Sequence, residues 1–291
     1  MVISLGKEMR AQYYTGSHLD FGQNRVQYNE FFWQSYNFER FKVFFHGDGK
    51  NHAVYAAKSA HKSLIDLEEL LDFNLKQKVE ILVFNSQSQF QQSNIGLTND
   101  INSNIGGVTK IVGSKIFVFY EGDHRSLDQQ IKSGLTEILL QQLMYGGNWK
   151  DVLKNNTLLS LPDWYLKGFI AYAGKGWSTE IDNLVKDGIL TDRFVNFNAL
   201  QNKDAELAGQ AIWNYIAEVY GENVIPNVLY MTRVSRSIES GFLFVLGTSL
   251  KTIMHDYQNY YKRKYRADEK FRGQNTGNQL TFKTKKKYNY N

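Results

Sequence analysis

The sequence predicts an α+β protein, in which a small N-terminal mixed sheet with helices is followed by a helical C-terminal half. Apolar residues alternate at the strand period only before residue 124, whereas afterwards they recur every three or four positions. The chain has 291 residues, of which 42% are hydrophobic and 14% aromatic, so it can fill a sizeable core. Global disorder is therefore excluded by composition.

The N-terminal elements follow from local patterns. Residues 1–37 are aromatic-rich and irregular, and we expect an N-terminal extension that packs on the body. Residues 38–47, FERFKVFFHG, alternate around Phe41, Val43 and Phe45, which predicts a strand. Helical spacing over residues 52–75 predicts a long amphipathic helix, and KVEILVFN, residues 78–85, predicts the next strand.

The middle of the chain predicts a loop, a hairpin and a buried helix. Residues 86–107 are polar, and residues 106–123 form two apolar runs around Gly113 and Ser114, which indicates a β-hairpin. Ser126 followed by Gln129 fits a capping box, so a helix is predicted from residue 126 to residue 146. Its buried stripe consists of Leu127, Ile131, Leu135, Ile138, Leu139 and Leu143.

The second half predicts a series of helices. Pro162 suits the first turn of a helix within LPDWYLKGFIAYAG, residues 161–174. Further helices are expected at residues 180–188, 205–220, 222–232 and 237–262. Polarity and charge rise from about Arg263, so residues 38–262 are assigned to the folded domain and residues 263–291 to a basic linker.

The positive charge of the chain is concentrated at its end. Residues 262–291 hold ten Lys and Arg against Asp268 and Glu269, which leaves 24 basic and 27 acidic side chains in residues 1–261. Such a tail could bind an anionic surface. No helix or aromatic-rich platform is expected beside it, so specific nucleic-acid binding is not predicted. The chain has no cysteine, and no apolar run approaches the ~20 residues of a membrane span.

The helix around residues 131–147, IKSGLTEILLQQLMYGG, stands where a zinc hydrolase carries H-E-x-x-H. The order of elements, followed by LPDWYLKGFIAYAG, resembles the peptidase MA-like domain of gluzincin-type metallopeptidases. In that family a pattern like HELTHxLL precedes LPxWLxEGLAEY. The resemblance covers roughly residues 38–260 and implies a zincin-like fold.

The resemblance also implies a metal site that has lost its ligands. Ser133 stands at the first histidine, Gly134 at the general base, Glu137 at the second histidine and Lys167 at the third ligand. Zinc sites use three or four protein ligands, so the resemblance implies a pseudo-metallopeptidase with no cofactor. Because both positions faced one ion in the family, we expect Glu137 and Lys167 to be bridged directly, through Ser133 or through water.

Several segments more narrowly resemble the N-terminal region of TolB-like translocation proteins of bacterial envelopes. These segments include AQYYTGSHLDFGQNRVQYNEFFW and YMTRVSRSIESGFLFVLG. The resemblance implies a location in the periplasm or cell envelope, with a truncated signal peptide. It also implies a β-propeller downstream in the parent chain.

The expected function is therefore a catalytically inactive scaffold, or a module that binds a protein or peptide partner in the envelope. Two alternatives stay open: a hydrolase of unrecognised chemistry in the same cleft, and an anionic-surface binder that uses the basic tail. The cleft is expected to be lined by residues of two segments, namely Trp164, Tyr172, Gly107, Val108, Thr109 and Lys110.

Overall fold

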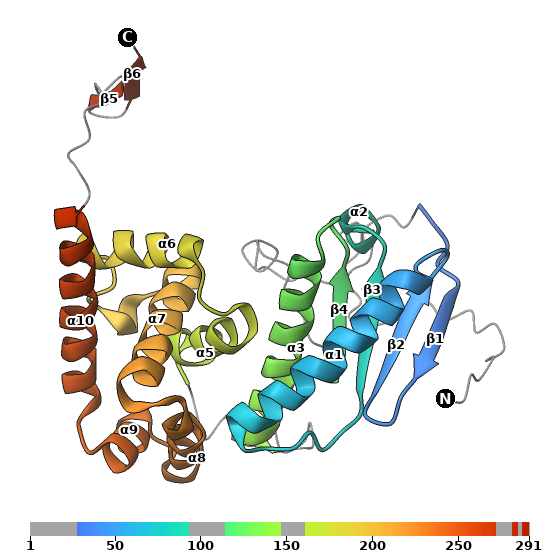
Figure 1. Ribbon diagram of the computed structural model, residues 1–291, viewed down its shortest axis with the longest axis horizontal. Helices are drawn as coiled ribbons and strands as arrows, with labels where there is room; N and C mark the ends of the chain where they lie inside the picture. The colour runs from blue at the N-terminus through green and yellow to red at the C-terminus, as the bar shows by residue number, and fades with distance from the viewer. Residues whose placement is uncertain (1–27, 93–113, 147–160, 272–280, 285–286, 291) are drawn as a thin grey trace, which may run out of the picture.

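A computed structural model describes residues 28–92, 114–146, 161–271, 281–284 and 287–290 (Figure 1). The predicted α+β class is confirmed. A four-stranded sheet with two long helices occupies one side of the molecule, and helices α5 to α10 occupy the other. The expected hairpin lies partly outside the described residues. Residues 107–110 of the expected cleft lie entirely outside them.

The sheet has the order β1-β2-β3-β4. Its strands are β1 (Trp33–Asn37), β2 (Phe41–His46), β3 (Val79–Phe84) and β4 (Lys115–Phe119). β1 is antiparallel to β2, whereas β2, β3 and β4 are parallel to one another. The three parallel strands read as nearly continuous apolar runs because both of their faces are buried.

Two long helices cover one face of this sheet, α1 (Lys50–Leu71) and α3 (His124–Tyr145) (Figure 1). Alanines on α1, such as Ala53 and Ala60, are fully buried and let that helix lie close to the strands. α3 lies equally close, because a Cβ at Gly134 would meet Ile116 of β4 at 2.7 Å. The opposite face carries a second apolar cluster around Leu82, with the short helix α2 (Gln87–Phe90) beside it.

The helical half is built around α5 (Asp163–Lys175) and α7 (Asn202–Tyr220). These helices cross with their backbones in contact, because a Cβ at Gly209 would lie 2.8 Å from Gly168 Cα. The buried rings of Tyr165, Trp213 and Phe242 pack edge to face or tilted around this crossing. The remaining helices are α6 (Thr179–Leu190), α8 (Ile225–Ser235), α9 (Ile238–Leu246) and α10 (Leu250–Phe271).

Some predicted boundaries are wrong. Residues 33–37, expected to be irregular, form strand β1, since the aromatic residues there pair with β2. α3 begins at His124, because the Asp123 carboxylate, and not Ser126, accepts hydrogen bonds from the first free main-chain N–H groups. The helix expected at residues 237–262 is two helices, separated by Gly247 at φ 70°.

The predicted start of a linker at Arg263 is also wrong, because α10 continues to Phe271. Tyr265 is buried, and Lys186 of α6 forms a 3.0 Å ion pair with Asp268, so both residues tie this part of α10 to the body. Strands β5 (Thr281–Thr284) and β6 (Lys287–Tyr290) form an antiparallel pair further along the chain. Within the residues that the structure describes, no helix is long and apolar enough to cross a membrane.

Candidate functional site

The predicted vestigial site lies where α3 packs against α5, and this joint is closed. Ser133 of α3 is fully buried. A Cβ at Gly174 of α5 would lie 2.6 Å from Ser133 Cα, which means that the two helices are in backbone contact here. Gln129 of α3 also donates a 3.4 Å hydrogen bond to the main-chain oxygen of Lys175. The glycine and the serine therefore serve close helix packing.

Glu137 lies one turn further along α3 and is partly buried. Gln141 donates a 3.2 Å hydrogen bond to its carboxylate. Burial raises the pKa of Glu137 to about 7, and the positive charge of Lys167 opposes that rise. This glutamate is therefore a carboxyl group that changes charge near neutral pH.

The predicted Glu137–Lys167 bridge is wrong in its direct form. Lys167 Nζ lies 2.8 Å from Asp163 Oδ2, one turn back on α5, and both side chains are exposed. Ser133 does not mediate a bridge either, because its hydroxyl has no hydrogen-bond partner among the described residues. Lys167 prefers Asp163 because an exposed i,i+4 pair forms without the cost of dehydrating the ammonium group. The two helices nevertheless bring its charge near Glu137, as the effect on the Glu137 pKa indicates.

The residues at these positions do not fit the zinc ion of the resembled family. Ser133, Gly134, Glu137 and Lys167 supply one carboxylate, one unpartnered hydroxyl and a cation. Zinc ligation in proteins draws on three or four imidazole, thiolate or carboxylate groups. Among the described residues, no three His, Cys, Asp or Glu gather closely enough to hold a metal ion.

The structure also places the expected cleft residues. Trp164 is buried against Tyr165 and Phe197, so the prediction that it lines a cleft is wrong. It faces inward because it lies on the buried stripe of α5, with Gly168 and Ala171 at the i+4 and i+7 positions. Tyr172 is partly buried and donates a 2.8 Å hydrogen bond to Glu222. These two side chains therefore do not share a surface for a ligand.

The carboxyl end of β4 is closed by a side chain that sequence reasoning missed. The Gln130 amide accepts a 3.0 Å hydrogen bond from the main-chain N–H of Phe119 and donates a 2.9 Å bond to the Phe119 oxygen. In this way it satisfies the main-chain N–H and C=O groups of Phe119 as a neighbouring strand would. An added peptide strand cannot pair with Phe119 while Gln130 is in place.

A second polar cluster, also missed, lies at the carboxyl ends of the parallel strands, where open α/β sheets commonly hold ligands. His52 of α1 stacks on Tyr120 with ring centroids 4.3 Å apart. Asp128 of α3 accepts hydrogen bonds from Tyr55 at 2.9 Å and from Ser59 at 2.5 Å. Both carboxylate oxygens are thus engaged by α1. The cluster joins α1 to α3, and the hydroxyls of Tyr55 and Ser59 are both hydrogen-bonded to Asp128.

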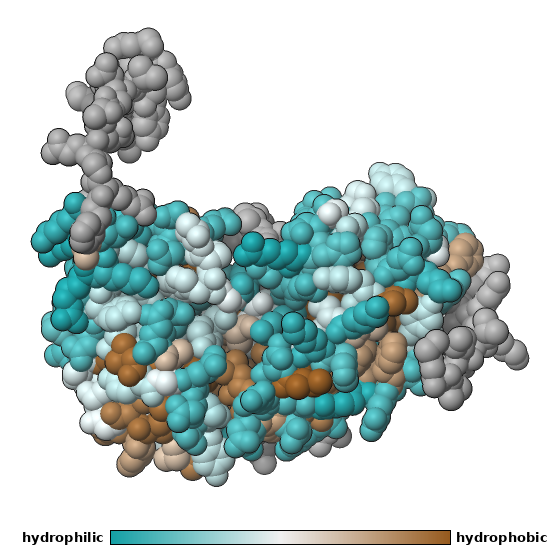
Figure 2. All heavy atoms as spheres, in the orientation of Figure 1, coloured by the Kyte–Doolittle hydropathy of each residue, from teal (hydrophilic) through white to brown (hydrophobic). Residues whose placement is uncertain are grey.

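An exposed apolar surface covers α8 and α9. Figure 2 shows hydrophobic residues gathered at the lower left, where Figure 1 places these two helices. Its members are the most exposed apolar side chains of the two helices, and we call them the α8–α9 surface: Tyr230, Val234, Leu243 and Phe244, which are 54%, 57%, 46% and 69% exposed. The sequence contained a signal for it, because IESGFLFVL is apolar on nearly every side.

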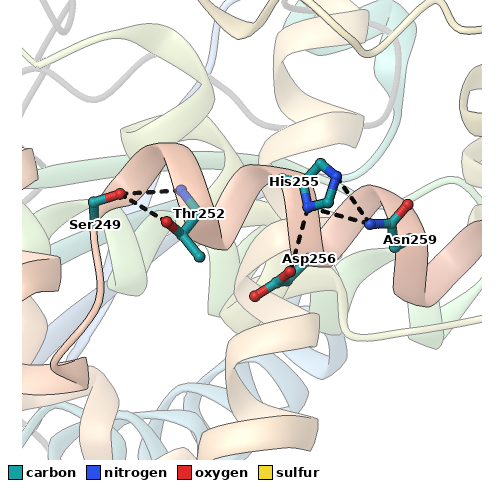
Figure 3. A network of polar contacts seen from close by, with 5 residues as sticks. All are labelled: Ser249, Thr252, His255, Asp256 and Asn259. Atoms are coloured by element: carbon teal, nitrogen blue, oxygen red, sulfur yellow. Dashed lines mark hydrogen bonds and ion pairs between the residues drawn. The ribbon is translucent and has the colours of Figure 1, made fainter.

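Helix α10 borders two grooves, one on each side. One groove has a volume of about 560 Å³ and lies between α10 and residues 195–197. Figure 3 shows the polar side chains along this part of α10, which bond to one another. Asn259 Nδ2 lies 3.2 Å from His255 Nδ1, and Asp256 Oδ1 lies 3.4 Å from the same nitrogen. The other groove, between α7 and α10, has a volume of about 590 Å³ and is lined in part by Arg263 and Arg266.

No model of a known protein family matches the chain, and no curated protein matches it either. The resemblance to the peptidase MA-like domain and to TolB-like proteins stays a prediction.

Proposed function

We propose that the protein is a non-catalytic binding module of the bacterial cell envelope, built on a zincin-like, peptidase MA-like scaffold. In this proposal the helix that holds catalytic groups in the resembled family serves only to join the two halves of the domain. The closed contact of Ser133 with Gly174 supports this role, because it fills the interhelical space with backbone. A downstream β-propeller in the parent chain would be held by this scaffold.

The observation that carries the proposal is the α8–α9 surface. Phe244 is 69% exposed on a nine-residue helix in which Phe242 is fully buried, so the helix presents apolar side chains both to the core and to solvent. Exposed apolar patches of this kind mark protein–protein contacts in soluble proteins. α9 also packs closely on α8, since a Cβ at Gly241 would lie 3.0 Å from the main-chain N of Thr232. An apolar face on closely packed helices loses little conformational entropy when it binds a partner.

The test places a photo-activated cross-linking residue at Phe244 and exposes the protein to envelope extracts. Cross-linked proteins are identified by mass spectrometry, purified and titrated by calorimetry. The proposal expects one protein that binds saturably and loses at least tenfold in affinity to the variant Leu243→Ser/Phe244→Ser. Val54→Ser is the matched control, because Val54 is 41% exposed on α1, on the sheet-bearing side.

Equal binding by the double variant and the wild type would contradict the proposal. So would a concentration-dependent dimer in light scattering that Leu243→Ser/Phe244→Ser abolishes, because the surface would then bind a second copy of the chain. Hydrolysis of a peptide library by the purified protein would favour the alternative of an enzyme.

A further inference from the structure

The groove between α7 and α10 brings two arginines next to a group of tyrosines. It is bordered on α10 by Asp256, Asn259, Tyr260, Lys262, Arg263 and Arg266, and on α7 by Tyr215, Val219 and Tyr220. Residues 256, 259, 260, 263 and 266 follow the i, i+3, i+4, i+7 spacing of one helix face. The groove therefore runs along α10, with successive side chains forming one wall.

Two of its cations lack a partner in the part of the chain that the structure describes. Among the described residues, Arg263 and Arg266 form no ion pair and no hydrogen bond, and both are exposed. Nearby lysines are engaged: Lys262 pairs with Asp192 at 2.5 Å, and Lys186 pairs with Asp268. Arginine presents a planar fork of donors that matches a carboxylate, and two arginines one turn apart can reach the same anion.

Aromatic side chains line the α7 side of the groove and the adjoining face of α10. Tyr215 packs against Tyr260 with ring centroids 5.3 Å apart, and against Tyr220 at 6.3 Å. The Tyr260 hydroxyl donates a hydrogen bond to Glu218, which holds the side chain in place along the groove. Val219, 48% exposed, adds an aliphatic edge. This wall suits an aromatic or aliphatic side chain next to the charged group of a ligand.

The groove is also polarised along its length. Asp256 precedes Arg263 by two turns of α10, which is about 10 Å along the helix axis. A chain with an anion at every unit, such as a nucleic acid, would place a phosphate near Asp256 and be repelled. A peptide can present a carboxylate to the arginines and uncharged residues to the other end. The expectation that no helix or aromatic wall accompanies the basic segment was wrong, because α10 and these tyrosines do.

We propose that this groove binds a short acidic peptide segment, in which a carboxylate side chain stands next to an aromatic or aliphatic residue. Arg263 and Arg266 hold the carboxylate, and the tyrosine wall takes the neighbouring apolar side chain. The groove on the other side of α10 is a weaker candidate, because Gln258, His255 and Glu239 there already bond to the protein. This site is separate from the α8–α9 surface and does not depend on it.

The experiment uses the full chain and a fluorescein-labelled octapeptide, Gly-Ser-Asp-Phe-Asp-Phe-Ser-Gly, with Asn in place of both Asp as the neutral control peptide. Binding is measured by fluorescence anisotropy. The variant Arg263→Gln/Arg266→Gln removes both cations, and Arg263→Lys/Arg266→Lys keeps the charge but not the planar fork. The matched control is Lys251→Gln/Lys264→Gln, which removes two exposed cations of α10 that lie outside this groove.

The proposal expects the acidic peptide to bind at least tenfold more tightly than the neutral one. Arg263→Gln/Arg266→Gln should lose at least tenfold in affinity, the lysine variant about threefold, and the control variant less than twofold. Loss of the same size in the control, equal binding of both peptides, or tighter binding of a thymidine decanucleotide would overturn it. The variant Leu243→Ser/Phe244→Ser should bind the acidic peptide as the wild type does, so failure here is separable from failure of the proposed partner surface.

Discussion

The α3–α5 joint and the α7–α10 groove are both places where polar side chains lie on facing helices, but they differ in what those side chains have left to bind. At the joint, Ser133 is in contact with Gly174, and Glu137 is partly buried and accepts a hydrogen bond from Gln141. In the groove, Arg263 and Arg266 are exposed and lack partners among the described residues. The joint is a packing contact, whereas the groove keeps its charges available.

The difference has a physical cause. A polar group buried between helices loses its water, and it destabilises the fold unless a protein partner replaces that water. A helix contact therefore tolerates few polar groups and favours glycine and small residues. On an outer helix such as α10, unpaired cations stay hydrated and cost little, so they can be kept for a ligand. Four predictions separate the two regions, in order of decreasing effect.

The largest effect is expected where the joint is tightest. Gly174→Ala places a Cβ within 2.6 Å of Ser133 Cα, and backbone cannot yield as a flexible side chain can. We expect the free energy of unfolding in urea to fall by about 2–3 kcal/mol, in spite of the higher helix propensity of alanine. Arg263→Gln/Arg266→Gln is the control and should leave stability unchanged. A Gly174→Ala protein as stable as the wild type would show that the two helices are free to separate.

The next effect is the pH dependence of stability that Glu137 causes. Its pKa is raised to about 7 in the folded protein, from an ordinary value of 4.5, so between these values the native state holds a proton that the unfolded state has released. Stability should therefore fall as pH rises from about 4.5 to 7 and then level off. A shift of this size corresponds to about 3.4 kcal/mol, of which we expect roughly 2 kcal/mol because Glu137 is only partly buried and water screens its charge. Glu137→Gln should remove this slope.

The measurement for Glu137 is the difference in unfolding free energy between the wild type and Glu137→Gln across that pH range. The difference isolates this group, because every other titrating side chain is present in both proteins. A difference that does not change with pH would mean that the carboxylate is hydrated, and that this edge of the joint is open like the groove.

A smaller effect, of opposite sign, is expected at Ser133. Its hydroxyl is buried and has no partner among the described residues, so Ser133→Ala removes an unsatisfied polar group. We expect a gain of about 0.5–1 kcal/mol in the free energy of unfolding. Thr136→Ala on the same helix is the matched control, since the Thr136 hydroxyl donates a 2.7 Å hydrogen bond to the Lys132 oxygen. That variant should lose stability, and loss in both variants would indicate that Ser133 has a partner after all.

Sequence patterns predicted the fold better than the site, and particular residues show why. The buried stripe of α3 and the strands around Val43 and Ile81 follow simple periods, which a single sequence displays. The ion pair that Lys167 forms depends on which of two carboxylates, Asp163 or Glu137, lies nearer in space. No sequence period encodes that distance. Composition alone predicts a linker for the arginines of α10, because this segment is basic and polar. The contact of α10 with Tyr215 of α7 joins segments far apart in the chain, so no local pattern in the sequence displays it.

The smallest effect on stability, and the sharpest test of the joint, comes from Lys167→Ala. The ion pair of Lys167 with Asp163 is exposed, with side chains 45% and 50% accessible, so its loss should cost less than about 0.5 kcal/mol. The same substitution removes the positive charge that lowers the Glu137 pKa, so that pKa should rise further. The carboxyl carbon of Glu137, followed by NMR during a pH titration, reports it directly. Lys58→Ala, which removes an exposed cation from α1, should leave it unchanged. An unaltered Glu137 pKa in Lys167→Ala would mean that the two side chains do not sense each other, and that the alignment of α3 and α5 with a former metal site has no basis in their geometry.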